Sequence, residues 1–436
     1  MMQLTGPDTA SAFAAASLVR DDRVHRRVFE DPAIFELEME RIFGRAFVYV
    51  GHESQVPALG DFVTTYIGRN PVVLCRHQDG AIHVLHNRCG HRGALVCNIA
   101  SGNVRRFRCP YHGWSFETNG DLHAVPARSG YGPGFDLGAP EFGMVRVPQV
   151  AQYRGFVFAS LAAQGDAFAL PPMMRRCIDT IIERAPDEAI ELAGGVHRYE
   201  FRGNWKAQVE NILDHYHPAF SHESTVVADG RQFQRSDGEE EGTPIFDDAG
   251  GIASWDRAEI VAFPDGNGLQ GPMPGADKPK SGALFERYRA ALLRRHAPDR
   301  VAQILANEWF HNAVFYPNMF IQLRALLVRV VRPIAVDHTE VCVYPIRLKG
   351  APDEMFQSQI RFLNLTHSAG SLIQTDDMEM FRRVQAGLTT AGADWVVLGR
   401  GLSAERPEEG GRRAPGTSEL SMRAQYVAWK RHMAAE

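Results

Sequence analysis

Two short loops, each carrying one cysteine and one histidine, constrain this chain more than any other feature. The first reads Cys89-Gly90-His91, and the second, after seventeen intervening residues, reads Cys109-Pro110-Tyr111-His112. Two thiolates and two imidazoles bind either a structural zinc ion or a [2Fe–2S] cluster, in which the cysteines hold one iron and the histidines the other. Because each loop supplies one ligand of each kind, the pattern favours two irons over one zinc.

Composition excludes several classes of protein. The chain has 436 residues, 44% of them hydrophobic, which suits a large core in about two or three domains. A formal net charge of −5 argues against general nucleic-acid binding, and six scattered cysteines exclude a disulfide scaffold. No apolar run reaches the roughly 18 residues of a membrane span, and the apolar stretch 12–19 lacks the basic start of a secretory signal. We therefore expect a cytoplasmic protein without a membrane partner.

The pattern along the chain predicts three regions. Residues 1–45 contain a helix that starts at Asp31-Pro32 and is expected to pack on the last region. Residues 46–161 alternate short β-rich runs with Gly, Asn and Asp turns, which predicts an all-β domain. Residues 162–436 mix helices and strands, and within them residues 228–280, rich in Gly, Pro and acids, predict a long surface insertion.

A second group of metal-binding side chains lies in a helix predicted to begin near Asn204. Asp214, His217 and His222 form the pattern Asp-x-x-His-x-x-x-x-His. Asp214 and His217 would share one helical face, and Pro218 would kink the helix so that His222 turns back toward them. Isolated helical histidines are usually surface residues, but this whole group, downstream of the two loops, indicates a metal site.

A non-haem iron(II) site with two histidines needs a carboxylate as its third ligand. The predicted helix around residues 374–381 offers Asp376 and Asp377. Asp377 shares a helical face with Met380 and Phe381, where a buried carboxylate requires compensation that a metal would supply. We therefore select Asp377 over Asp376, which could instead cap the start of this helix.

Two further residues are candidates for substrate binding. Asn211 precedes Asp214 by three residues and is expected to line the iron pocket. Arg324 lies in a predicted strand over residues 319–331, and its guanidinium fork suits a carboxylate, although an ordinary ion pair explains it at least as well.

No segment predicts a bound nicotinamide or flavin. Residues 266–271 match Gly-x-Gly-x-x-Gly, but we expect no strand before them, and Pro272 and Pro274 follow. A dinucleotide site requires a strand, a turn and then a helix. We therefore interpret this segment as a loop.

The two loops closely resemble the Rieske domain of ring-hydroxylating oxygenases. Respiratory Rieske proteins are similar but carry an extra cysteine in each loop, whereas Ala94 stands at that place here. The resemblance implies an α+β chain, with an all-β Rieske domain and a catalytic domain whose antiparallel sheet is flanked by helices (helix-grip or START-like). It implies one [2Fe–2S] cluster and one Fe²⁺ ion per chain, held respectively by Cys89, His91, Cys109 and His112 and by His217, His222 and Asp377.

The same resemblance implies an assembly and a substrate class. In this family an acid on the ligand-bearing helix connects to a Rieske histidine of a neighbouring subunit, which here would join Asp214 to His112 of the partner subunit. That connection implies a homotrimer, with or without a small β subunit. The spacing from Asn211 to Asp214 resembles the branch that acts on aromatic acids such as terephthalate, salicylate and anthranilate.

The function implied is that of a terminal oxygenase. It would take electrons from a separate NAD(P)H-dependent reductase, directly or through a ferredoxin, and would hydroxylate or cis-dihydroxylate an aromatic compound, with an aromatic carboxylate expected. One alternative is a Rieske monooxygenase that removes methyl groups or oxidises an alkyl ammonium compound. Another is a pure electron carrier with a decayed second domain, against which the intact Asp214, His217 and His222 argue.

Overall fold

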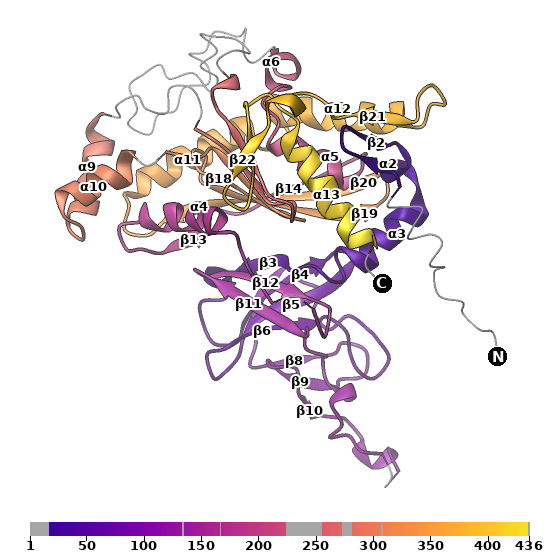
Figure 1. Ribbon diagram of the computed structural model, residues 1–436. Helices are drawn as coiled ribbons and strands as arrows, with labels where there is room; N and C mark the ends of the chain where they lie inside the picture. Colours follow the sequence, from indigo (N-terminus) through magenta and orange to yellow (C-terminus); the bar gives the residue numbers. More distant parts are fainter. Residues whose placement is uncertain are drawn as a thin grey trace. The chain divides into compact units, whose positions relative to one another are not determined.

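The computed structural model describes residues 17–132, 135–165, 167–223, 255–272, 281–306 and 308–434 (Figure 1). The chain forms two compact units. The smaller unit is Phe43–Phe168, and the larger one joins Met1–Ile42 to Ala169–Glu436. The boundaries expected from the sequence, 45/46 and 161/162, lie three and seven residues from these divisions.

The described part of the smaller unit consists of three antiparallel sheets, which confirms the predicted all-β fold. In the largest of them, β5 (Asn70–Arg76) pairs with β4 (Asp61–Ile67) on one side and β6 (Ile82–His86) on the other. The run 72–75 of β5 is buried throughout, so its residues are continuously apolar rather than alternating. The remaining strands are β3 (Val48–His52), β7 (Ser101–Asn103), β8 (Arg106–Arg108), β9 (Ser115–Glu117), β10 (Leu122–Ala124), β11 (Gln149–Tyr153) and β12 (Phe156–Ser160).

The larger unit centres, within its described residues, on a ten-stranded antiparallel sheet. Its longest hairpin is formed by β19 (Leu327–Ala335) and β20 (His338–Leu348). The sheet runs in the order β13-β20-β19-β18-β17-β16-β15-β23-β22, and β14 also pairs with β20. The other strands are β13 (Ile190–Leu192), β14 (His197–Phe201), β15 (Ile260–Ala262), β16 (Gly268–Gln270), β17 (Asn312–Phe315), β18 (Met319–Gln322), β22 (Arg406–Glu408) and β23 (Gly411–Ala414).

Helices pack against this sheet, which confirms the predicted α+β class. Helix α5 (Trp205–Ile212) contacts β19, α11 (Asp353–Thr366) contacts β20, and α13 (Leu420–Ala434) contacts β15 (Figure 1). None of the helices in the described residues has the length and apolar character needed to cross a membrane. The unit also contains α2 (Arg27–Glu30), α3 (Pro32–Arg41), α4 (Pro172–Glu183), α6 (Pro218–Ser221), α9 (Ala283–Leu293), α10 (Pro298–Ala306), α12 (Leu372–Leu388) and the small sheet of β1 (Val19–Arg20), β2 (Arg23–His25) and β21 (Trp395–Val397).

The predicted surface insertion over residues 228–280 is wrong where the structure describes it. Strands β15 and β16 are buried and form a hairpin inside the main sheet. Its turn is closed by a 2.9 Å bond from the Phe263 N–H to the Asn267 carbonyl, with Gly266 at a φ of +86° that favours glycine. Strand β15 therefore precedes the Gly-x-Gly-x-x-Gly segment, and Gly268–Gln270 of that segment form strand β16 where a dinucleotide site would have a helix. Residues 228–254 and 273–280 lie outside the described residues.

The predicted single strand over residues 319–331 is also wrong. It is a hairpin, because β18 ends at Gln322 and β19 begins at Leu327. Leu326 adopts a φ of +49°, and the Gln359 side chain donates a 3.0 Å hydrogen bond to the Ala325 carbonyl. Tertiary contacts thus stabilise a turn that the continuous apolar pattern conceals, and Arg324 lies in this turn rather than in a strand.

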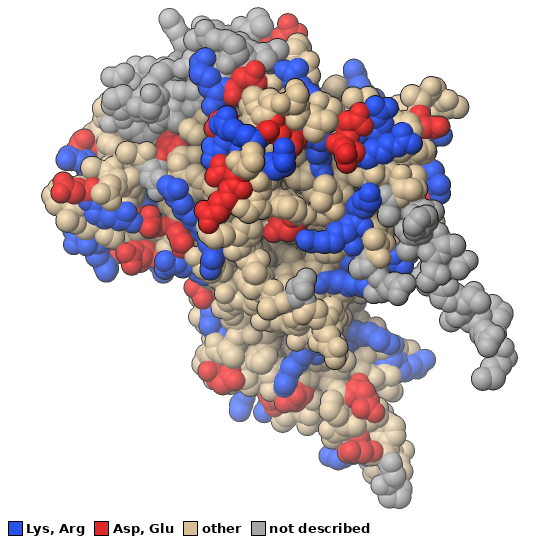
Figure 2. All heavy atoms as spheres, in the orientation of Figure 1, with Lys and Arg blue, Asp and Glu red and all other residues tan. Residues whose placement is uncertain are grey.

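Charged side chains are interspersed over the face of the larger unit shown in Figure 2. Elsewhere in this unit, the partly exposed Glu259 forms ion pairs with both Arg406 and Arg413. Ion pairs that water and salt reach contribute little to stability.

A fully buried carboxylate joins three helices of the larger unit. Glu38 on α3 accepts hydrogen bonds from Lys206 Nζ at 2.6 Å and Trp205 Nε1 at 2.8 Å, both at the start of α5. It also accepts one from Trp429 Nε1 on α13 at 2.6 Å. Burial lowers the pKa of Lys206, and the Glu38 charge opposes that shift. The cluster therefore positions the start of the helix that leads to His217.

Replacing Glu38 by Gln should destabilise the protein by about 3 kcal/mol, because Lys206 loses its counter-charge inside the core. Urea unfolding followed by tryptophan fluorescence would measure this. The matched control is Glu40→Gln on the exposed side of the same helix, for which we expect a change within about 0.5 kcal/mol. Equal stabilities of the two variants would contradict this role for Glu38.

Candidate functional site

The two cysteine–histidine loops of the smaller unit have the same backbone structure. The Cys89 N–H donates to the Ala94 carbonyl at 2.8 Å, and the Cys109 N–H donates to the Trp114 carbonyl at 2.8 Å. In each loop the residue four positions after the cysteine is a glycine in the left-handed region, with φ of +76° at Gly93 and +71° at Gly113. Glycine adopts this conformation without strain, which allows each loop to turn tightly. The loops therefore form a symmetric pair.

Their side chains form a compact donor set. Both cysteines are buried, and the His91 and His112 rings lie 4.7 Å apart, centre to centre. His91 also stacks on Trp114 at 4.7 Å, and its Nδ1 is buried without a hydrogen-bond partner. Burial raises the pKa of the Cys89 thiol, and the backbone N–H groups of His91 and Arg92 oppose that rise. With thiols inside and imidazoles at the outer end, the arrangement fits a cluster of two differently ligated irons.

The second motif follows α5, and there the predicted geometry is wrong. The helix is capped by the Asn204 side chain, which accepts from the Lys206 N–H, and it ends at Ile212. The Asp214 carboxylate accepts a hydrogen bond from the Tyr216 N–H at 2.7 Å. This side-chain turn takes the place of a backbone hydrogen bond that would have continued the helix. Pro218 begins the short helix α6 instead of kinking a long one. Asp214 and His217 therefore lie in a non-helical link and do not share a helical face.

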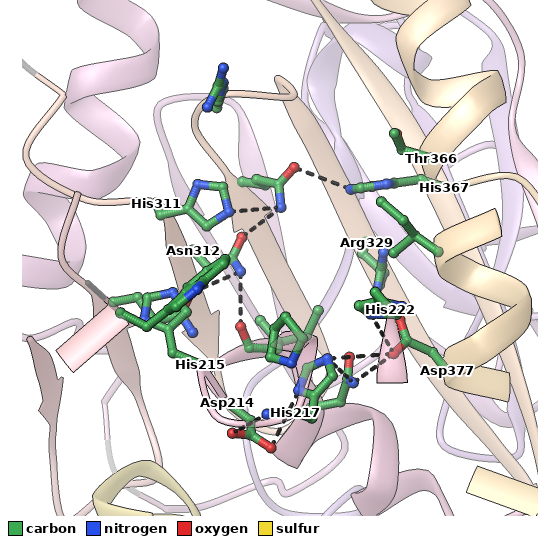
Figure 3. Close-up of a pocket in the computed structure, with 18 of the residues that line it drawn as sticks. Asp214, His215, His217, His222, His311, Asn312, Arg329, Thr366, His367 and Asp377 are labelled. Atoms are coloured by element: carbon green, nitrogen blue, oxygen red, sulfur yellow. Dashed lines mark hydrogen bonds and ion pairs between the residues drawn. The ribbon is translucent and has the colours of Figure 1, made fainter. Parts of the chain in front are cut away.

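The structure nevertheless brings together the three residues that the sequence analysis selected as iron ligands. One ligand atom from each of His217, His222 and Asp377 lies within 4.8 Å of the others. The Asp377 carboxylate on α12 places Oδ1 3.5 Å from His217 Nε2 and 3.3 Å from His222 Nε2 (Figure 3). Two imidazoles and a carboxylate converging in a buried pocket fit the donor set of a non-haem iron site.

Each histidine of this group is also backed by an outer carboxylate. Asp214 Oδ2 lies 3.3 Å from Nδ1 of His217, and Asp376 Oδ2 lies 3.3 Å from Nδ1 of His222. Such contacts orient an imidazole and leave its Nε2 free for a metal. Ser371, rather than Asp376, caps α12, so the alternative role suggested for Asp376 is wrong.

Electrostatics keep both the partly buried Asp214 and the buried Asp377 ionised. Burial would raise the pKa of Asp214, but the hydrogen bond and charge of His217 outweigh it and hold that pKa below its usual value. Burial would likewise raise the pKa of Asp377, but His222 and His217, followed by Arg329, lower it. Both carboxylates are therefore in the form that binds a cation or a protonated imidazole.

Asn211, which was expected to line the pocket, does so and contacts two of the three proposed ligands. Its Nδ2 is 3.0 Å from Asp377 Oδ1 and 3.1 Å from His217 Nε2. It lies in the last turn of α5, one residue before the helix ends at Ile212. Its amide therefore borders the space in which a metal would sit.

A pocket extends from these residues along one face of the sheet. Its apolar wall is formed by Ile212, Pro218, Trp255, Phe362 and Ile373. Its polar wall contains both predicted substrate residues and several that the motifs did not reveal: Asn211, Arg324, His215, Gln270, His311, Asn312, Gln322, Arg329, Thr366 and His367.

The polar wall has a defined hydrogen-bond direction. Asn312 Nδ2 donates to the Ile212 carbonyl at 2.9 Å, and a carbonyl can only accept, so Asn312 Oδ1 accepts from Gln322 Nε2 at 2.9 Å. Gln322 Oε1 then accepts from His367 Nε2 at 3.1 Å. The second Gln322 N–H faces His311 Nε2 at 3.4 Å. The end of α5 thus determines which nitrogen of each histidine carries the proton.

The histidines of this wall are neutral near pH 7. Burial lowers the pKa of His367 to about 3 and that of His215 to about 4. Burial also takes the pKa of His311 well below its usual value. These three histidines come from segments far apart in the sequence: His215 lies in the link after α5, His311 directly precedes β17 and His367 directly follows α11. Only the folded arrangement of these segments brings them to one wall, so no sequence pattern indicated them.

Two family descriptions match the chain. Residues 46–151 match the Rieske [2Fe-2S] domain, and residues 191–435 match the ring hydroxylating alpha subunit (catalytic domain). The chain belongs to the ring-hydroxylating alpha-subunit family. This confirms the predicted family, fold and class of enzyme, an oxidoreductase. The Rieske domain implies a [2Fe–2S] cluster and the catalytic domain a mononuclear iron, so both cofactors are confirmed and the zinc alternative is wrong.

Known members of the family are similar along nearly the whole chain. The toluate 1,2-dioxygenase subunit alpha of Pseudomonas putida is 32% identical over 409 residues, covering 91% of this chain and 87% of that protein. The anthranilate 1,2-dioxygenase large subunit of Acinetobacter baylyi is 32% identical over 397 residues, covering 87% and 80%. The crystal structure of naphthalene 1,2-dioxygenase from Rhodococcus sp. bound to indole is 25% identical with a TM-score of 0.78, covering 100% of both chains.

Replacing Asp377 by Asn should remove the mononuclear iron, because the charged carboxylate that faces both imidazoles becomes a neutral amide. Iron analysis should then fall from about three to about two atoms per chain. The control is Asp376→Asn, which should weaken iron binding by about 10- to 100-fold and still fill at saturating ferrous iron. Loss of iron from the Asp376 variant alone would contradict our selection of Asp377.

Replacing Cys109 by Ser should abolish the visible absorption of the cluster, because a thiolate ligand is lost. Cys97→Ser is the matched control, since Cys97 is also buried in the same core but lies outside the donor set. It should keep the spectrum after anaerobic reconstitution. Bleaching of both variants to the same extent would contradict the assignment of ligands.

Proposed function

We propose that this chain is the terminal oxygenase component of an aromatic-carboxylate hydroxylase. Two relatives that match most of the chain are named for oxidising toluate and anthranilate, both aromatic acids. The observation that carries the proposal is the position of two cations: Arg324 and Arg329 line the pocket. The carboxylates that also line it, Asp214 and Asp377, contact His217 and His222. An anionic substrate suits the arginine-lined part of this pocket.

We assign the metal ligands residue by residue. Cys89, His91, Cys109 and His112 hold the [2Fe–2S] cluster, and His217, His222 and Asp377 hold the iron. When bound, the cluster supplies electrons singly and the iron activates dioxygen. The protein's own contribution is to orient the imidazoles through Asp214 and Asp376 and to border the reaction space with Asn211.

The partners follow from the same proposal. A separate NAD(P)H-dependent reductase, directly or through a ferredoxin, reduces the cluster. Asp214, which backs His217, connects to His112 of the partner subunit in a homotrimer, with or without a small β subunit. The cytoplasmic location expected from the sequence belongs to this proposal.

The experiment is a substrate screen of the reconstituted enzyme with NADH and a generic reductase. We expect oxygen consumption and hydroxylated products with benzoate, toluate and anthranilate, and kcat/KM at least about 10-fold lower with neutral arenes. Demethylated products from methylated amines, without ring hydroxylation, would contradict the proposal and favour the monooxygenase alternative.

His217→Ala tests the separation of the two metal centres. It should reduce oxygenation by more than about 100-fold and leave the visible spectrum of the cluster intact, because His217 belongs to the iron site alone. His338→Ala, in a histidine that pairs with Glu200 outside the pocket, is the control and should retain activity. A bleached spectrum in the His217 variant would contradict this separation.

A further inference from the structure

Arg329 is a buried cation without a described partner. On β19, Arg329 pairs with Phe320 of the neighbouring strand β18. Leu327, two residues earlier on β19, pairs with Gln322 of β18. Because side chains two apart share a face of a strand, Arg329 lies on the same face as the pocket residue Gln322. It lines the pocket and is only 5% exposed. Its Nε has no hydrogen-bond partner, and among the described residues its guanidinium forms no ion pair.

Arg329 lies at the iron end of the pocket. Its charge helps to lower the pKa of Asp377, after the larger effects of His222 and His217, and it also lowers the pKa of His367. In Figure 3 it lies on the same side of the pocket as Asp377. The nearby acids are already engaged, since Asp377 and Asp376 contact His222. A buried charge without a hydrogen-bonded counter-ion is costly, so the site suits an anionic ligand.

We propose that Arg329 binds the carboxylate of the aromatic substrate and so determines the specificity for acids. This inference rests on the proposed function and deepens it. The planar guanidinium can hold both carboxylate oxygens at once. The ring would then contact the apolar wall of Ile212, Phe362 and Ile373, with the carbons next to the carboxylate nearest to the metal ligands.

Arg329 replaces our sequence-based candidate in this role. Arg324 lies in the turn between β18 and β19, and its charge acts on His311, whose pKa it lowers after burial and His215. Arg324 also has an interaction of its own, so it is not an uncompensated cation. Arg329 is the more deeply buried of the two and acts on the iron ligand Asp377.

The test compares the binding of benzoate and of neutral benzamide to the reconstituted holoenzyme by calorimetry. Arg329→Gln should weaken benzoate binding by about 100-fold or more and benzamide binding by less than about 3-fold. Arg329→Lys, which keeps the charge but loses the fork, should weaken benzoate by about 10-fold. Arg332→Gln is the matched control on the opposite face of β19, where Arg332 pairs with Glu340 at 3.2 Å, and it should bind both ligands like the wild type.

Two results would overturn the inference. One is an equal loss of benzoate and benzamide binding in Arg329→Gln while its thermal stability is unchanged. The other is a larger selective loss of benzoate in Arg324→Gln than in Arg329→Gln. Should the Arg329→Gln variant not fold, a wild-type enzyme that binds benzoate no more tightly than benzamide would also overturn it.

The failure of the proposed function has a different signature. A wild-type enzyme that oxidises neutral arenes and neither binds nor oxidises aromatic acids would contradict the carboxylate specificity itself. A wild-type enzyme that prefers benzoate, with no selective loss in Arg329→Gln, would contradict only the role of Arg329.

Discussion

One carboxylate oxygen, Oδ1 of Asp377, faces the Nε2 atoms of both His217 and His222, and the catalytic unit is arranged around this convergence. A carboxylate buried in this way needs positive charge close by. Outer acids hold the Nδ1 sides of both imidazoles, so their Nε2 atoms point inward. The break in the chain after α5 and the placement of Asp377 on α12 are the two structural features that make this possible.

The end of α5 also orders the hydrogen bonds of the pocket wall. The carbonyl at the end of α5 sets the polarity of the chain from Asn312 through Gln322 to His367, so that a single backbone group defines several donors and acceptors. Burial keeps the histidines of the wall neutral. Arg324 and Arg329 line the same pocket, and we propose that an acidic substrate pairs with Arg329.

The features predicted correctly from the sequence are those that short motifs define. The Rieske loops were identified from their cysteine and histidine spacing, and their resemblance to a known family implied the α+β fold. Asp377 was selected because it shares a helical face with apolar residues. The helix around His217 was predicted wrongly, because the Asp214 side chain competes with the helical hydrogen bonds and ends α5 early. Arg329 and Gln322 could not be identified at all, since only the strand register of a ten-stranded sheet places them in the pocket.

The most direct test of the central claim is anomalous X-ray diffraction at the iron edge from crystals grown anaerobically. One isolated iron peak is expected at bonding distance, about 2.0–2.2 Å, from both Nε2 atoms and from the Asp377 carboxylate. A separate pair of peaks is expected between the two Rieske loops. An isolated iron bound through Nδ1 of either histidine, or located away from Asp377, would contradict the account.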